Sequence, residues 1–284
     1  MRWPPPCSNV SAKHEAVTGS GIPPILLVGL GKMGGAMLAG WRERGLAAAV
    51  AVDPTLPAAP GPEVTVVADA AAIPAGFVPA AVVLAVKPQT AAEVVPHYAR
   101  FATGAVFLSI MAGRTIAGLR PLLGERAALV RAMPNTPAAV RQGITVACAG
   151  PGVTAPQRAL CDALLAAIGA VAWVEDEALL DPVTAVSGSG PAYVFLLAEL
   201  MERAAIEQGI TADLARLLAR HTVAGSGALL AASTEDAAAL RRAVTSPRGT
   251  TESALAVLME DQAWPALISR AIAAATARSR ELAG

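Results

Sequence analysis

A glycine-rich segment near the amino end of the chain has the residue types and the spacing that bind a dinucleotide. Gly29, Gly31 and Gly34 form the pattern G-x-G-x-x-G, directly after a short apolar run and before apolar residues at helical spacing. In this context the first glycine permits a tight turn, the second lets the backbone approach a pyrophosphate, and the third allows close packing of a helix on a strand. The helix N-terminus would then face the phosphate charge. The segment predicts a Rossmann-type coenzyme site, with a ligand-free glycine turn as the alternative.

An acidic residue follows at the distance expected of a ribose ligand. Asp53 lies 53 − 34 = 19 residues after the last glycine of the motif, and the acidic residue that binds a ribose 2′-hydroxyl lies about 20 residues on. Taken alone, this favours NADH. No Arg or Lys that would bind a 2′-phosphate occurs between Asp53 and Lys87, and a cation from a loop distant in sequence is the open alternative. The alternative is that Asp53 caps the turn that begins at Pro54.

Lysine is rare in the chain and falls at informative places. Lys87 follows a buried run, at the carboxyl edge where ligands bind in open α/β sheets. Only Lys13, Lys32 and Lys87 occur, and the last two lie in predicted coenzyme loops. A solvated loop residue before a proline is the alternative for Lys87.

Composition limits the classes to which the protein can belong. A length of 284 residues suits two domains, and 54% hydrophobic with 15% charged residues excludes intrinsic disorder. The mean hydropathy of +0.52 raises the question of a membrane protein, but Gly, Pro, Arg or Asp interrupts the apolar stretches before the roughly 18 to 20 residues of a span. Lys+Arg and Asp+Glu are 22 each. We therefore expect a small-molecule substrate, with no nucleic acid and no membrane as partner.

The cysteines and histidines point to no metal site. Cys7, Cys148 and Cys161 share no metal-ligand spacing, and their odd number argues against a disulfide framework, so we expect a reducing, cytoplasmic location. The three histidines do not cluster with carboxylates and are assigned no acid role. Residues 1–24 lack the unbroken apolar segment of a secretory signal and are expected to form a flexible tail.

The pattern of elements predicts an α/β fold in two parts. A glycine turn and a helix over 33–44 follow the first apolar run, and later runs alternate with segments of crossover length, as in a parallel sheet with helices on both faces. Strands are expected at 25–28, 49–52, 64–67, 81–86, 105–110, 129–133 and 144–148. Helices take over in the second half, at 193–208, 212–230, 237–243 and 253–283. We expect a Rossmann-like doubly wound domain over 25–180 and an all-α domain over 181–284.

Six segments carry a family resemblance. The chain resembles pyrroline-5-carboxylate reductase, the last enzyme of proline biosynthesis, over nearly everything after the tail. The segments are G-L-G-K-M-G at 29–34, A-V-K-P-Q at 85–89, S-I-M-A-G at 109–113, R-A-M-P-N-T-P at 131–137, S-G-S-G-P-A-Y at 187–193 and T-S-P-R-G-T-T at 245–251. The last three are the most specific, because a G-x-G-x-x-G alone is shared by many dehydrogenases.

The resemblance implies an oxidoreductase that reduces the cyclic imine L-1-pyrroline-5-carboxylate to L-proline by hydride transfer from NADP(H) or NAD(H). It implies that the helical domain pairs two chains, as a homodimer or a larger ring of dimers. It implies that the Thr251 hydroxyl reaches the ring nitrogen as the catalytic group, and that the substrate lies against Ser187, Gly188, Ser246, Gly249, Thr250 and Thr251. It places the coenzyme against Gly29, Gly31, Lys32, Met33, Gly34, Asp53, Val86, Lys87, Pro88, Ala112, Gly113, Asn135 and Thr136.

Two departures from the family pattern occur, and three rival functions stay open. Arg248 stands where the family usually has a second glycine, and Lys32 replaces a common asparagine.

A β-hydroxyacid dehydrogenase is the first rival. It shares the glycine loop and a helical domain, but it uses a lysine in the helical domain, and this chain has no lysine after Lys87. A different imine reductase is the second rival, and a non-catalytic NAD(P)-binding scaffold is the third. The family also commonly prefers NADPH, whereas Asp53 favours NADH.

Overall fold

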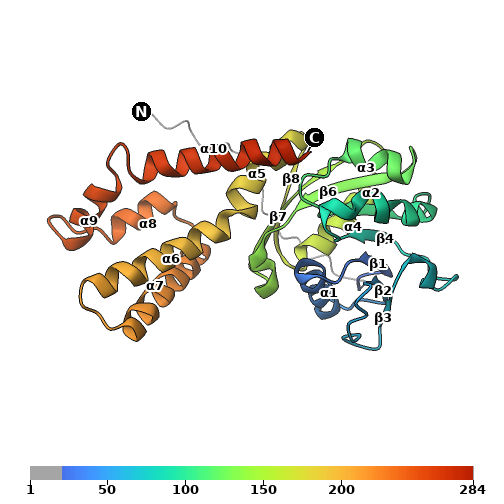
Figure 1. Cartoon of the computed structure of the whole chain (residues 1–284), viewed down its shortest axis with the longest axis horizontal. Coiled ribbons are helices and arrows are strands. Elements are labelled where there is room, and N and C mark those ends of the chain that lie inside the picture. Colours follow the sequence, from blue (N-terminus) through green and yellow to red (C-terminus); the bar gives the residue numbers. More distant parts are fainter. Residues whose placement is uncertain (1–20, 284) are drawn as a thin grey trace. The chain divides into compact units, whose positions relative to one another are not determined.

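The computed structural model of the chain describes residues 21–283, and these form two compact units (Figure 1). The first unit runs to Thr184 and takes in the carboxyl end from Ser279, and the second comprises Ala185–Arg278. Residues 1–20 of the predicted tail lie outside the described residues. Ile22, which the sequence assigned to the tail, is a buried member of the core of the first unit.

The first unit is built on one eight-stranded sheet with the order β3-β2-β1-β4-β5-β6-β7-β8. The strands are β1 (Ile25–Val28), β2 (Ala49–Val52), β3 (Val64–Val67), β4 (Ala81–Leu84), β5 (Val106–Ser109), β6 (Ala128–Met133), β7 (Gly143–Ala149) and β8 (Gly169–Val174). All neighbours from β3 to β6 are parallel, so the carboxyl ends of these six strands lie at one edge. That edge is where ligands bind in open α/β sheets.

Two features of the sheet correct the sequence-based expectation. β7 is antiparallel to β6, with Arg131 opposite Cys148, so the sheet is mixed rather than parallel throughout. The cause is the short link between Met133 and Gly143, because a parallel crossover needs a dozen residues or more. β8, which was not predicted, pairs in parallel with β7 at the end of the sheet.

Helices cover both faces of the sheet. Those of the first unit are α1 (Lys32–Glu43), α2 (Ala91–Val94), α3 (Ile116–Leu123), α4 (Ala155–Ala166) and α5 (Leu180–Val183), with short 3₁₀ turns between several elements. Successive residues of β1 belong to different cores: Leu27 packs with Trp41 of α1 and Leu164 of α4, whereas Leu26 packs with Leu119 of α3. The doubly wound, Rossmann-like fold predicted from the sequence is confirmed.

The second unit consists of helices, as predicted. After the π-helical turn η6 (Thr184–Gly188) come α6 (Gly190–Glu207), α7 (Ala212–Ala232), α8 (Ala237–Ala243), α9 (Thr250–Leu258) and α10 (Trp264–Ala283). The expected single helix over 253–283 is two helices. Pro265, in the first turn of α10, explains the break, because a proline inside a continuous helix would remove a hydrogen bond and clash with the preceding turn.

The second unit leaves large apolar side chains in solvent. Its buried apolar residues are three alanines, Ala185, Ala215 and Ala219. The exposed residues of α6 and α7 include Val194, Phe195, Leu196, Leu200, Ile206, Leu214, Leu217, Leu218, Leu229 and Leu230. By length and composition alone, the helical stretch Glu177–Glu207 is long and apolar enough to cross a membrane, with a mean hydropathy of 1.3 in its 18-residue window. That finding qualifies the expectation that no apolar stretch reaches such a length.

Candidate functional site

The glycine loop lies between β1 and α1, and its geometry explains each glycine. Gly29 has φ +101°, and a Cβ there would lie 2.8 Å from the Ala85 carbonyl oxygen. A Cβ at Gly34 would lie 2.2 Å from the carbonyl oxygen of Gly29. A Cβ at Gly31 would meet no protein atom within 4 Å. The first and third glycines therefore pack the helix against the loop, whereas the second borders open space, as close approach of a ligand requires.

The first turn of α1 is available to an anion. Gly31 is its N-cap residue and has no side chain with which to satisfy the free backbone N–H groups, and no acidic residue lies in the first turn. Lys32 and Met33 open the helix, and Lys32 is exposed. Free N–H groups and the helix dipole favour a phosphate here. The residues of the loop thus fit the pyrophosphate of a dinucleotide coenzyme.

Asp53 lies at the carboxyl end of β2 and touches the glycine loop. Its Oδ2 accepts a hydrogen bond from the Leu30 N–H at 2.9 Å, and its Oδ1 accepts from the Thr55 N–H at 3.0 Å and the Thr55 hydroxyl at 2.6 Å. Partial burial raises the pKa of Asp53, but these hydrogen bonds outweigh it and leave the pKa below its usual value. The carboxylate is therefore charged at neutral pH.

The remaining predicted coenzyme residues also lie in loops that follow parallel strands. Val86, Lys87 and Pro88 come after β4, Ala112 and Gly113 after β5, and Asn135 and Thr136 after β6. The structure thus brings every predicted coenzyme residue of the first unit to one edge of the sheet.

The loops at this edge are braced by their own hydrogen bonds. The Arg114 Nε donates to the Pro88 carbonyl at 2.8 Å, and so links the loops after β5 and β4. The Asn135 Oδ1 accepts from the Ile144 N–H at 3.0 Å, which holds the start of β7. The Asn135 Oδ1 is therefore already engaged in a hydrogen bond within the chain.

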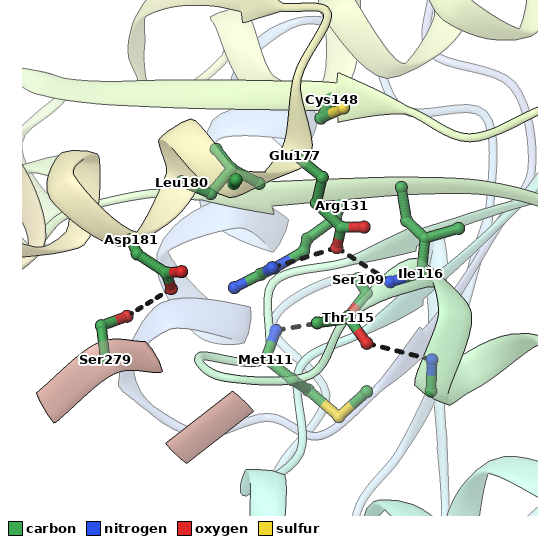
Figure 2. A network of polar contacts seen from close by, with 12 residues as sticks. Ser109, Met111, Thr115, Ile116, Arg131, Cys148, Glu177, Leu180, Asp181 and Ser279 are labelled. Carbon is green, nitrogen blue, oxygen red and sulfur yellow. Dashed lines mark hydrogen bonds and ion pairs between the residues drawn. The ribbon is translucent and has the colours of Figure 1, made fainter. Parts of the chain in front are cut away.

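Sequence reasoning missed a partly buried polar network that joins several elements of the first unit (Figure 2). The Oε1 of Glu177 accepts from Nη1 of Arg131 at 3.0 Å and from the N–H of Ile116 at 2.9 Å. Arg131 lies on β6, Ile116 opens α3, and Glu177 precedes α5, so one carboxylate oxygen joins three elements. Arg131 belongs to the quoted R-A-M-P-N-T-P string, but nothing in the sequence signals its partner.

Two side chains on neighbouring strands flank Arg131. Ser109 on β5 and Cys148 on β7 are its paired neighbours across the sheet. Burial, followed by the charges of nearby carboxylates that include Glu177, raises the pKa of the Cys148 thiol. Burial of Cys148 thus disfavours the thiolate, which is the nucleophilic form of a cysteine.

In the second unit, Ser187 and Gly188 form the end of the π-helical turn η6. Among the described residues, Ser187 Oγ is the one buried side-chain nitrogen or oxygen without a hydrogen-bond partner. The turn is supported from α6, where the Tyr193 hydroxyl donates to the Ala185 carbonyl at 3.1 Å. π-Helical turns occur frequently at functional sites.

The predicted substrate segment, residues 245–251, ends at the N-terminus of α9. Gly249 is the N-cap residue and offers no side-chain cap, so the first N–H groups of the helix that begins at Thr250 are available to a ligand. Arg248 has φ 59°, in the left-handed region, and its N–H donates to the Glu252 carboxylate at 2.7 Å. Backbone N–H groups in such a turn suit a carboxylate ligand.

Comparison with known proteins shows one consistent similarity. Residues 177–282 match the family model described as pyrroline-5-carboxylate reductase dimerisation. The chain is 42% identical to the pyrroline-5-carboxylate reductase of Pseudomonas aeruginosa over 203 residues, which cover 71% of this chain and 74% of that protein. It is 39% identical to the enzyme of Mycobacterium tuberculosis over 225 residues, covering 71% and 76%.

Solved structures show the same similarity. A pyrroline-5-carboxylate reductase from Coxiella burnetii, 31% identical, superposes with a TM-score of 0.83 over 92% of this chain and 98% of that chain. The Plasmodium falciparum pyrroline carboxylate reductase, solved with NADP bound, shares the fold at 24% identity, with a TM-score of 0.78 over 92% of this chain and 98% of that one.

Proposed function

The chain belongs to the pyrroline-5-carboxylate reductase family, and from this membership we infer the roles of its residues in the reduction of L-1-pyrroline-5-carboxylate to L-proline by NAD(P)H. The observation that carries the inference is the 42% identity to a reductase of which the chain covers 74%. The coenzyme supplies the hydride that reduces the C=N carbon. The protein binds and orients both reactants and stabilises the charge on the imine.

We propose that the loop residues after the parallel strands bind the coenzyme. The uncapped N-terminus of α1 and the open space at Gly31 suit the pyrophosphate. The full set is Gly29, Gly31, Lys32, Met33, Gly34, Asp53, Val86, Lys87, Pro88, Ala112, Gly113, Asn135 and Thr136. Their common place at one sheet edge supports this role.

We propose that the second unit binds the imine. The N–H groups at the start of α9, together with Ser246, Gly249 and Thr250, would hold the ring carboxylate, and the Thr251 hydroxyl would donate to the ring nitrogen as hydride arrives. Ser187 and Gly188 would border the ring, which would give Ser187 Oγ the hydrogen-bond partner that it lacks. No titrating acid is required, because the imine can bind in its protonated form.

The match to a dimerisation family over residues 177–282 supports assembly of the chain with copies of itself. We propose a homodimer or a ring of dimers, and a cytoplasmic location. The exposed apolar side chains of α6 and α7 support the assembly, because a contiguous apolar surface marks an interaction site.

The activity is tested by following NADH and NADPH oxidation at 340 nm with the purified protein, with pyrroline-5-carboxylate added last. We expect loss of absorbance that depends on the imine. A six-membered cyclic imine serves as the comparison substrate: if it is reduced faster, the protein is a different imine reductase. Coenzyme binding without any imine-dependent oxidation would instead favour a scaffold.

Thr251 is tested by the pair Thr251→Ala and Thr251→Ser. The alanine variant should lose about 10- to 100-fold in kcat, because it removes a donor to the lone pair that develops on the ring nitrogen as hydride reaches the carbon, while the fold remains intact. The serine variant retains the hydroxyl and should retain most of the activity. Steady-state kinetics measure kcat, and circular dichroism checks that each variant is folded. Unchanged kinetics in the alanine variant would refute the role of the Thr251 hydroxyl as a donor.

A further inference from the structure

We propose that this reductase binds NADH in preference to NADPH, and that the Asp53 carboxylate sets that preference. The proposal rests on the proposed function, since it concerns which of the two coenzymes occupies the site beside the glycine loop. Three features of the described residues carry it: the place of Asp53, the lone-pair position that it keeps free, and its unpaired charge.

Asp53 lies where an adenosine ribose is bound in this fold. It follows β2, which is the neighbour of β1 in the sheet, and Oδ2 accepts from the N–H of Leu30, inside the glycine loop. The same carboxylate therefore touches the loop that would hold the pyrophosphate. A ribose attached to that pyrophosphate lies next to the end of β2 in dinucleotide-binding folds of this kind.

The hydrogen bonds of Asp53 leave room for a ribose hydroxyl. A carboxylate has about four lone-pair positions. Leu30 uses one position on Oδ2, and the two donors of Thr55 use both positions on Oδ1. One position on Oδ2 remains, and it is available to accept from a 2′-hydroxyl. The three existing bonds also fix the orientation of the side chain before any coenzyme binds.

The charge of Asp53 is not neutralised by a neighbour. Its pKa is lowered by the hydrogen bonds from Thr55 and Leu30, in spite of partial burial, so the group stays ionised. No arginine or lysine forms an ion pair with it in the described part of the chain, and Arg42, a cation on the adjacent helix, is paired with Glu63 instead. A 2′-phosphate would thus place negative charge beside an uncompensated carboxylate, which disfavours NADPH.

The loop after Asp53 supplies no cation either. Pro54, Thr55 and Leu56 are exposed and uncharged, and the first basic residue after Asp53 is Lys87. NADP-binding versions of this fold place an arginine near the 2′-phosphate. In this chain Asp53 is present, and the segment 54–86 contains no arginine or lysine that would bind a 2′-phosphate.

The test measures dissociation constants of NADH and NADPH by coenzyme fluorescence, with the wild-type protein and no imine present. We expect NADH to bind at least about tenfold more tightly than NADPH. NADPH lacks the 2′-hydroxyl that would donate a charge-assisted hydrogen bond to Asp53, and its 2′-phosphate is repelled by the carboxylate. Raising the salt from about 0.02 to about 0.5 M should narrow the ratio of the two constants, because screening weakens repulsion at an exposed site. The pyrophosphate is common to both coenzymes and cancels from the ratio.

Two variants locate the effect. Asp53→Ser should bring the ratio close to one, mainly through tighter NADPH binding, and should abolish its salt dependence. Thr55→Val is the matched control, because it removes one hydrogen bond to the carboxylate but keeps the charge, and should preserve the preference. Asp53→Asn keeps the shape of the side chain and removes its charge, and it takes the place of Asp53→Ser if the serine variant is unstable.

The proposal is overturned if the wild-type protein binds NADPH as tightly as NADH, or if the ratio is the same in the Asp53 variants. These measurements need no substrate, so they remain informative if imine reduction is not observed. Failure of the proposed function would appear as coenzyme binding, with its preference intact, but no imine-dependent oxidation.

Discussion

The backbone at Arg248 takes a conformation that an arginine disfavours. Its φ of 59° lies in the left-handed region, where a residue with a Cβ is less stable than glycine by roughly 1 to 2 kcal/mol. The resemblance to the family places a glycine at this position, so the departure noted from the sequence has a structural cost. The Arg248 side chain is exposed, immediately before the N-cap of α9.

Arg248→Gly should therefore stabilise the protein, by up to about 1 kcal/mol after the greater flexibility of glycine in the unfolded chain is subtracted. Arg248→Ala is the control, because it removes the charge but keeps the Cβ, and it should not stabilise. Urea unfolding of the three proteins measures the difference. Equal stability of the glycine and wild-type proteins would mean that the turn relaxes around the side chain.

The same pair of variants shows whether the guanidinium assists the substrate carboxylate. If the cation contributes, both variants raise the KM for the imine by a similar factor. We expect no such change, because the proposed carboxylate ligands at this turn are backbone N–H groups and hydroxyls. Steady-state kinetics over a range of imine concentrations provide the measurement.

At the level of single residues, the sequence was informative wherever one residue type is required. Gly29 was predicted to permit a tight turn and Gly34 to allow close packing, and the structure supplies the positive φ of the first and the short Cβ approach of the second. The contact of Asp53 with Leu30 was not predictable, because it joins positions 23 residues apart through a loop geometry that no local pattern encodes.

Among the elements, Glu177 connects parts of the first unit that are distant in sequence. Its carboxylate oxygen binds the N-terminus of α3 and the buried Arg131 of β6, whose side chain is only 5% exposed. β6 ends at Met133 and leads into Asn135 and Thr136, which belong to the proposed coenzyme site. A charge at this depth is stable only while its partner is present.

Glu177→Gln should lower the free energy of unfolding by about 2 to 4 kcal/mol, because it leaves the Arg131 guanidinium without a compensating charge. The double variant Arg131→Met with Glu177→Leu should recover much of that loss, since no buried charge remains. Glu175→Gln is the matched control: its side chain is 89% exposed and its ion pair with Arg158 is superficial, so we expect a change below about 0.5 kcal/mol.

With the single variants Arg131→Met and Glu177→Leu added to close the cycle, urea unfolding gives the coupling energy between Arg131 and Glu177. Additive effects of the single substitutions would show that the pair contributes no specific stability. An increase in the KM for coenzyme in Glu177→Gln, at temperatures where it is fully folded, would further indicate that the network positions the loop after β6.

The elements themselves were predicted best where they are long or buried. β1 and β2, apolar throughout, have the bounds expected from the sequence. The direction of β7 was wrong, because strand direction depends on the length of the preceding connection, which the apolar pattern does not record. β8 was missed because alanine-rich, half-buried edge strands lack an apolar alternation. Pro265 was a readable signal for the start of α10.

At the scale of the whole molecule, the second unit has a very small apolar core of its own. Its buried apolar residues are alanines, while α6 and α7 expose Phe195, Leu217 and other large side chains. Burial of such side chains supplies most of the free energy of folding. Only 6% of the most apolar window of Glu177–Glu207 is buried within the chain. The match of residues 177–282 to a dimerisation family supports the proposal that a second copy of the chain covers this surface.

Replacing Phe195 (67% exposed) or Leu217 (54% exposed) by glutamate should therefore prevent assembly. Each substitution would place a charge in the proposed interface, where burial without a partner is strongly unfavourable. Val78→Glu is the control, because Val78 is 78% exposed in the first unit and should tolerate a charge. Light scattering coupled to gel filtration measures the mass, and we expect the control and the wild-type protein to exceed the mass of one chain.

The proposed assembly would also make stability depend on protein concentration. The wild-type Tm should rise with concentration, since association stabilises the folded state by mass action, whereas the Tm of the Phe195 and Leu217 variants should be lower and constant. A monomeric wild-type protein would contradict the proposal, as would variants that keep the full assembly mass. If the wild-type protein is recovered only with detergent, the exposed apolar helix contacts a membrane instead. The purification therefore distinguishes an interface between chains from a membrane contact.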